Sequence, residues 1–68
     1  MRISARNQLA GTVTGVVEGA VNAEVTLDIG GAKITAMITR ESVRSLGLVP
    51  GKKAYAIIKA SEVLVGVD

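Results

Sequence analysis

Polar and apolar residues alternate with a period of two along most of the chain, which is the pattern of β-strands with one buried and one solvated face. The alternation is most regular in residues 23–29, where apolar side chains occupy the odd positions. It returns in residues 33–39 with apolar side chains at the even positions, and Gly30–Gly31 suits the tight primed turn of a hairpin. We therefore expect two antiparallel strands joined by a short turn.

The strand before this hairpin is less regular because it contains two glycines. It is expected over residues 9–17, and the apolar side chains expected on one of its faces are Leu9, Val13 and Val17. Gly11 and Gly15 predict a kink or a close approach of a neighbouring backbone. Residues 18–22 then form an expected turn, in which Gly19 is predicted to adopt a positive φ.

Residues 39–47 interrupt the alternation and predict a helix of about two turns. Thr39 is a suitable N-cap, and Gly47 is a suitable C-cap. Val43 and Leu46 lie three residues apart and would form a narrow apolar side. Such a side is sufficient to close one end of a small barrel.

Two further strands are expected over residues 52–58 and 63–67, which makes five strands with one short helix between the third and the fourth. That order is typical of an OB-like barrel, so the predicted fold class is all-β. Both of these strands have apolar residues at consecutive positions, and Tyr55 among them is expected in the core. Since one face covers the domain's own core, we expect a neighbouring subunit to cover the other.

The composition strengthens the expectation of an oligomer. The chain has 68 residues, of which 49% are hydrophobic, and it contains neither cysteine nor histidine. A domain of this size buries only about 60% of the surface of its unfolded chain, and no disulfide can compensate. A site for a metal cation is not expected either, because cysteine and histidine ligands are missing. Association with further copies is the remaining source of stability.

The same composition limits location and function. No apolar run approaches the roughly 20 residues needed to span a bilayer, and the N-terminus has no signal-peptide pattern, so we expect a soluble cytoplasmic protein without a membrane partner. The formal net charge of +2 is spread along the chain and does not by itself indicate nucleic acid. Without histidine or cysteine, the usual general base and the strongest nucleophile are missing. We expect neither an enzyme with catalytic residues nor an organic cofactor.

Three polar clusters are not explained by the strand pattern: Ser4–Gln8, the helix start Thr39–Ser42, and Lys59–Ser61. The first and the third contain hydroxyl, amide and cationic groups but no carboxylate. Arg6 and Lys59 together carry the charge that matches a tetrahedral dianion such as sulfate, phosphate, molybdate or tungstate. Each cluster also has a purely structural interpretation, as a strand end, a helix cap or a solvated edge. The spacing alone does not bring the clusters together.

The same segments resemble the molbindin family, also called Mop proteins, whose domains bind molybdate and tungstate. The resemblance extends along the whole chain, and the segments that carry it are Ile3–Leu9, Glu18–Val25, Ile38–Thr39 with Ser42, Leu46–Leu48, Gly51–Lys52 and Ile58–Ser61. It implies a single Mop domain over residues 1–68 that assembles with itself into a homohexamer, a trimer of dimers. Molybdate or tungstate would be the ligand, bound at subunit interfaces for intracellular molybdenum storage, buffering or homeostasis.

The resemblance also implies roles for individual residues. The implied oxyanion-binding residues are Ser4, Ala5, Arg6, Thr39, Ser42, Lys59, Ala60 and Ser61. Thr39 and Ser42 would approach from another subunit. A second site is implied at the turn after the first strand, and its residues are Gly19, Ala20, Val21 and Asn22. The chain departs from the family pattern at Arg40, where no charge is expected, and at Ala10, where some relatives carry a basic residue.

A nucleic-acid-binding module, or a small β-rich DNA-binding regulator, is the alternative function. OB-like barrels bind single strands through aromatic platforms beside a basic groove, and this chain offers only Tyr55 as a platform. The case for a regulator is based on the arginines, which are Arg2, Arg6, Arg40 and Arg44. Binding to random DNA with a steep salt dependence would favour this alternative. We do not expect nucleic acid as a partner.

Overall fold

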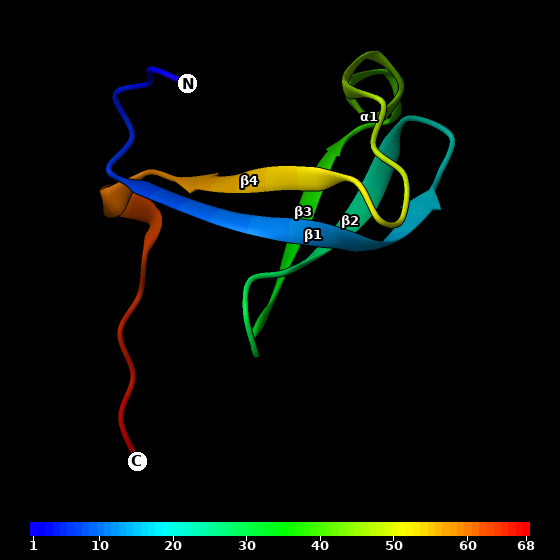
Figure 1. Ribbon diagram of the computed structural model, residues 1–68. Coiled ribbons are helices and arrows are strands. Elements are labelled where there is room, and N and C mark those ends of the chain that lie inside the picture. The colour runs from blue at the N-terminus through cyan, green and yellow to red at the C-terminus, as the bar shows by residue number, and fades with distance from the viewer.

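The computed structural model describes all of residues 1–68 and consists of one antiparallel sheet with a short helix. Its elements are β1 (Asn7–Glu18), β2 (Asn22–Asp28), β3 (Lys33–Thr39), α1 (Arg40–Leu46), β4 (Lys53–Ile58) and the 3₁₀ turn η1 (Ala60–Glu62). The strand order is β3-β2-β1-β4, so β1 is hydrogen-bonded on both sides. Figure 1 shows the β1–β4 pair crossing over β2 and β3, which curls the sheet into a half-barrel. The predicted all-β, OB-like class is confirmed, with the helix directly after the third strand.

The β2–β3 hairpin forms as the alternation predicts. Gly30 and Gly31 have φ values of 90° and 98°, and a positive φ at both central residues is what a type I′ turn requires. Ile29 N–H donates to Ala32 O at 2.9 Å and closes the turn. Asp28 Oδ1 accepts from the Gly30 and Gly31 N–H groups at 3.0 and 3.4 Å, which satisfies donors that the ladder leaves free.

A β-bulge in β1 changes which side chains reach the core. The register with β2 shifts between Val13 and Gly15, which leaves Thr14 as an extra residue and confirms the kink predicted near Gly15. An extra residue reverses the alternation of faces, so Val16 packs against the core and Val17 is 71% exposed. The prediction that Val17 shares the face of Val13 is therefore wrong.

The buried core is small and centred on β2. It consists of six apolar residues: Val13, Ala23, Val25, Leu27, Val43 and Ala56. The three from β2 occupy alternate positions, as predicted. Val43 is the helix residue that covers one end of the curled sheet. Leu46, expected to join it, is instead 59% exposed, because it faces a groove that the half-barrel leaves open.

The ends of α1 lie where the capping residues predict. Thr39 Oγ1 accepts a hydrogen bond from Ser42 N–H at 3.1 Å, which satisfies one of the free donors of the first turn. Gly47 has a φ of 65°, in the left-handed region, and its N–H donates to Arg44 O at 3.2 Å. No helix of this structure combines the length and the apolar character required to cross a membrane.

Gly19 does not have the positive φ that the sequence suggested. Its N–H donates to Asn22 O at 2.7 Å, and a Cβ atom at Gly19 would lie 3.0 Å from that same oxygen. The glycine is therefore favoured by a close approach of backbone rather than by a left-handed conformation.

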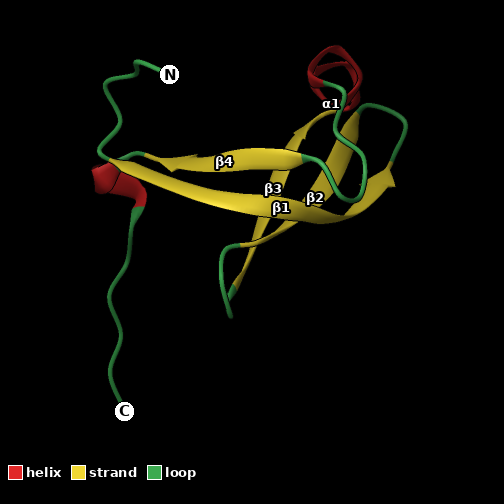
Figure 2. Ribbon diagram, viewed as in Figure 1, coloured by secondary structure: helices red, strands yellow, loops and turns green.

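The C-terminal residues do not form the fifth strand that the pattern predicts. Val63–Val67 has no partner in the sheet, and Figures 1 and 2 show the tail leading away from it as a loop. Val65 and Val67 are 92% and 95% exposed. β1 is already paired on both sides, and η1 turns the chain away from β4, so the segment gains no ladder partner within its own chain.

The prediction that Tyr55 lies in the core is also wrong, because its side chain is 56% exposed.

Gly11 is a point of close approach between β1 and the end of β2. A Cβ atom at Gly11 would lie 2.5 Å from Asp28 O and 2.9 Å from Ile29 Cγ2. We predict that Gly11→Ala lowers the free energy of unfolding by about 1–3 kcal/mol, the usual cost of overpacking, in chemical denaturation. Gly15→Ala is the matched control, because its Cβ would meet no atom within 4 Å. A Gly11→Ala variant as stable as this control would contradict the close approach.

Candidate oxyanion-binding site

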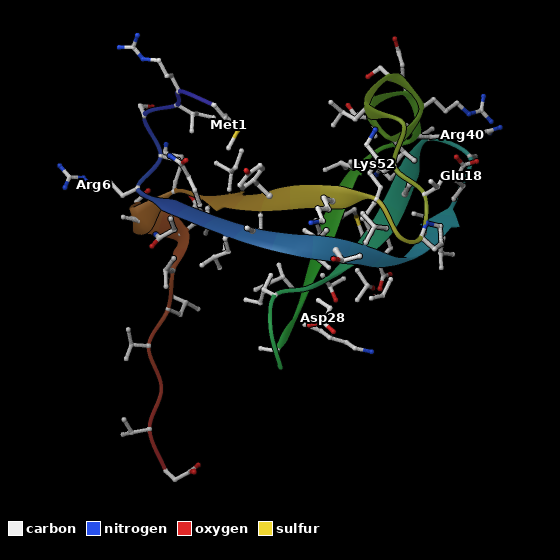
Figure 3. The ribbon with its side chains drawn as sticks, viewed as in Figure 1. Met1, Arg6, Glu18, Asp28, Arg40 and Lys52 are labelled. Atoms are coloured by element: carbon white, nitrogen blue, oxygen red, sulfur yellow. The ribbon has the colours of Figure 1, made fainter.

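The β1–β4 ladder brings the first and the third polar clusters to the same corner of the sheet. Asn7, the first residue of β1, pairs with Ile58, the last residue of β4, so residues 4–6 and 59–61 leave the sheet at one point. The Asn7 side chain fixes this junction, since its Nδ2 donates to Ile58 O at 3.2 Å. Figure 3 shows Arg6 at the start of β1 with its guanidinium directed away from the sheet. The structure thus supplies the convergence that sequence spacing alone did not.

The two cations at this corner, Arg6 and Lys59, lack carboxylate partners. Both ion pairs of the structure use Glu18 Oε2, which lies 3.5 Å from Arg40 Nε and 3.6 Å from Arg44 Nη2 at another place in the fold. Arg6 and Lys59 are exposed and take part in neither pair. The corner therefore has a surplus of positive charge that an anion would balance.

Backbone donors beside these cations are also without partners. In η1, Lys59 O accepts from Glu62 N–H at 2.9 Å, whereas the N–H groups of Ala60 and Ser61, at the start of the turn, have no partner within it. Ser4 and Arg6 N–H likewise have no backbone acceptor. Unpartnered N–H groups next to two cations form an environment that favours an anion with several acceptor oxygens.

Asn7 and Gln8 hold this corner together, although the sequence places them in the first polar cluster without giving either one a role. Asn7 ties β1 to the end of β4, as described, and Gln8 holds the segment before β1. Gln8 Nε2 donates to Ala5 O at 2.8 Å, and Ala5 itself is half-buried between Ser4 and Arg6. The sequence does not indicate these contacts, because each side chain binds a backbone carbonyl whose position depends on the folded path of the chain.

Thr39 and Ser42 lie at the opposite end of the sheet and form a helix cap of their own. Thr39 Oγ1 donates to Ser42 Oγ at 2.7 Å and accepts from Ser42 N–H. Thr39 pairs with Asn22, beyond the last residue of β1, whereas Arg6 precedes its first. The 12 residues of β1 therefore lie between the two places, in a domain whose longest principal extent is 35 Å. Figure 3 accordingly shows Arg6 and Arg40, the residue after Thr39, at opposite ends.

The turn Gly19–Asn22, implied as a second site, lies against the start of α1. Arg40 N–H donates to Val21 O at 2.8 Å, and a shallow hollow is lined by Ala20, Val21, Arg40, Glu41 and Arg44. Arg40, the departure from the family pattern, faces Glu18 rather than open solvent. Because two arginines stand beside two glutamates, this hollow has no surplus charge and is a weaker anion site than the corner.

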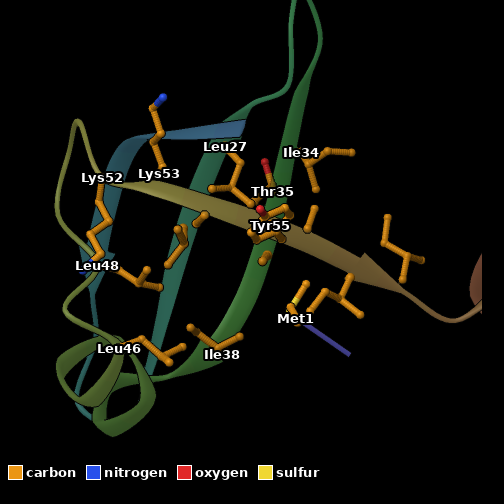
Figure 4. A pocket seen from close by; sticks show the side chains of 16 residues that line it. Met1, Leu27, Ile34, Thr35, Ile38, Leu46, Leu48, Lys52, Lys53 and Tyr55 are labelled. Carbon is orange, nitrogen blue, oxygen red and sulfur yellow. The ribbon is translucent and has the colours of Figure 1, made fainter. Parts of the chain in front are cut away.

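An apolar groove opens between β3 and β4, where the half-barrel is not closed. It has a volume of about 660 Å³, and 13 of its 16 lining residues are hydrophobic. Figure 4 shows Ile34 and Ile38 of β3 together with Leu46 and Leu48 along it. The three polar lining residues, Thr35, Lys52 and Lys53, are a minority in this apolar lining, which favours packing against apolar groups over binding of an oxyanion.

Comparison with known proteins relates nearly the whole chain to one family. Residues 3–65 match the family model described as TOBE domain. A relative from Haemophilus influenzae, called a probable molybdenum-pterin-binding protein, is 51% identical over 69 residues, and the alignment covers 100% of both chains.

Solved structures agree with this relation. MopII from Clostridium pasteurianum superposes with a TM-score of 0.91 at 46% identity, covering 97% of this chain and 100% of that chain. The molybdate-binding protein ModG, described as cytoplasmic and crystallised with molybdate bound, superposes with a TM-score of 0.93 at 56% identity. That match covers 100% of this chain and 49% of ModG. The curled sheet and its short helix are therefore shared with these proteins.

The Thr39 cap leads to a prediction about stability. We expect Thr39→Ala to lower the free energy of unfolding by about 1 kcal/mol, because it leaves a first-turn N–H without its acceptor. Thr39→Ser keeps the hydroxyl and should retain most of the wild-type value in the same denaturation experiment. Equal losses in the two variants would show that the methyl group, and not the cap, is responsible.

Proposed function

We propose that this chain, which belongs to the TOBE domain family and within it to the molbindins, binds molybdate and tungstate at the subunit interfaces of a homo-oligomer. The observation that carries the proposal is the corner where Arg6 and Lys59, without carboxylate partners, lie beside unpartnered backbone N–H groups. ModG, crystallised with molybdate, supports the choice of anion. The corner provides cations and donors, which suit an oxyanion rather than the ring system of a pterin.

The proposed binding chemistry uses donors alone. A tetrahedral dianion would be balanced by Arg6 and Lys59, and its oxygens would accept hydrogen bonds from the remaining groups of the corner. Those groups are the Ser4 and Ser61 hydroxyls and the backbone N–H groups of Ser4, Ala5, Arg6, Ala60 and Ser61. These groups include no histidine or carboxylate that would activate the two serine hydroxyls, so the anion would be bound and released unchanged. Storage, buffering or homeostasis of molybdenum in the cytoplasm, by one domain spanning residues 1–68, follows as the proposed role.

Thr39 and Ser42 would complete the site from another chain. They lie at the far end of β1 from Arg6, so they cannot reach the corner of their own chain. Because Ser42 Oγ accepts from Thr39 Oγ1, its own hydroxyl hydrogen remains available for an anion oxygen. A site composed in this way exists only where two copies meet.

The proposed assembly is a homohexamer built as a trimer of dimers. Each chain exposes an apolar groove between β3 and β4, and it also exposes the unpaired apolar tail Val63–Val67. Apolar surface of this extent in a chain of 68 residues marks contact surfaces between subunits. The groove and the tail are complementary in chemistry, and we infer that neighbouring copies cover both. A weaker second anion site at Gly19, Ala20, Val21 and Asn22 remains part of the proposal.

The proposed ligands give a prediction for affinity. Arg6→Gln and Lys59→Met should each weaken molybdate binding by about 10- to 150-fold, the loss expected for one charge-assisted hydrogen bond. Isothermal titration calorimetry with molybdate and with tungstate measures this directly. Lys33→Met is the matched control, because Lys33 is an exposed lysine outside the corner and belongs to no ion pair. Affinity losses of equal size in the control would show a general charge effect instead of a site.

The proposed contacts of the tail give a prediction for assembly. Val65→Asp should shift the protein toward smaller species in sedimentation velocity, because a buried carboxylate without a partner is costly at an apolar interface. Ala32→Asp in the exposed β2–β3 turn introduces the same charge away from the tail and should leave the sedimentation coefficient unchanged. An unchanged distribution for Val65→Asp would refute a tail buried between copies.

A further inference from the structure

The side-chain amide of Gln8 holds two carbonyl groups of the segment that precedes β1. Gln8 Nε2 donates to Ala5 O at 2.8 Å and to Ile3 O at 3.5 Å. An amide nitrogen carries two hydrogens, which matches these two acceptors. The short bond fixes the orientation of the peptide group after Ala5, and the longer contact orients the peptide group after Ile3 more weakly.

The planarity of the peptide group determines where the N–H groups of Ser4 and Arg6 point once Gln8 binds the preceding carbonyls. The chain has no cis peptide bond, and in a planar trans peptide the C=O and the following N–H point in opposite directions. Because the Ile3 and Ala5 carbonyls point toward Gln8, the N–H groups of Ser4 and Arg6 point away from it. Neither N–H has an acceptor elsewhere in the backbone.

The consequence for an anion is twofold. Carbonyl oxygens in contact with an oxyanion would repel it, and Gln8 keeps two of them engaged on the opposite side of the segment. The two N–H groups that it turns outward lie on residues 4 and 6, the same residues that carry the Ser4 hydroxyl and the Arg6 guanidinium. Two main-chain N–H groups directed to one side, next to a hydroxyl and a guanidinium, are donors that an anion with several oxygens can use.

We propose that Gln8 is a positioning residue of the oxyanion site, which orients the Ser4 and Arg6 N–H groups toward the anion without touching it. This inference rests on the proposed function. The positioning role explains why the exposed residue 8 is a glutamine. A glutamate of the same length would present only acceptors to the two carbonyls. A methionine of similar length would present no donor at all.

The test is the affinity of Gln8→Met for molybdate, measured by calorimetry on the intact assembly. We expect binding about tenfold weaker than wild type, since two oriented donors are lost without loss of any charged group. Gln8→Glu should bind more weakly still, because its carboxylate repels the carbonyls and the anion. Thr14→Val is the matched control. It removes the hydrogen bond that the exposed Thr14 Oγ1 donates to Thr26 O at 3.4 Å, far from the corner, and it should bind molybdate as the wild type does.

A spectroscopic measurement separates orientation from general stability. In ¹⁵N-labelled wild type, molybdate should shift the amide signals of Ser4 and Arg6, and the shifts should be much smaller in Gln8→Met while those of Ala60 persist. Wild-type affinity and wild-type amide shifts in Gln8→Met would overturn the positioning role and leave the proposed function intact. Failure of the wild-type protein itself to bind molybdate would overturn both.

Discussion

The pairing of β1 on both sides is the constraint on which the rest of the structure depends. Because β1 lies between β2 and β4, its first residue fixes the corner that contains Arg6 and Lys59, and its last residues fix the turn against α1. The same strand keeps these two ends apart by its full length. The donors of the proposed site are therefore distributed over both ends of each chain, and in the proposal association of chains brings them together.

The small core of the single chain also favours association with further copies. Only six residues are buried, which is a small core for a chain in which 49% of residues are hydrophobic. The half-barrel leaves a groove between its free edges, and the apolar tail lies outside the sheet and does not close it. Covering this surface would stabilise the fold, and the proposed anion would offset the repulsion of cations brought together at an interface. Folding, assembly and binding are thus linked in the proposal.

Features set by local chemistry could be predicted from the sequence. The caps Thr39 and Gly47 and the turn at Gly30–Gly31 depend on a few neighbouring residues, and all were predicted correctly. Gly15 predicted an irregularity in β1, but the extra residue Thr14 could not be identified, because it is defined only by the partner strand. This extra residue moved Val17 to the outer face.

Features that depend on distant contacts were harder to predict. The segment 63–67 has the composition of a strand, yet η1 turns it away from the free edge of β4, so it pairs with no strand of its own chain. For the site, the sequence indicated which clusters carry donors, whereas the β1–β4 register was needed to show which of them meet. The contacts of Gln8 were invisible in the sequence because they depend on the path of the backbone.

The central claim is that each binding site combines the corner of one chain with the helix start of another. Its most direct test mixes two variants, Arg6→Gln and Ser42→Ala, that each impair one half of the site, and measures bound molybdate by native mass spectrometry after subunit exchange. Ser42→Ala is suitable because it keeps the Thr39 cap, which uses the Ser42 backbone N–H. The account predicts that mixed assemblies regain high-affinity sites that neither variant has alone. Mixed assemblies that bind no more than the average of the two separate variants would contradict it.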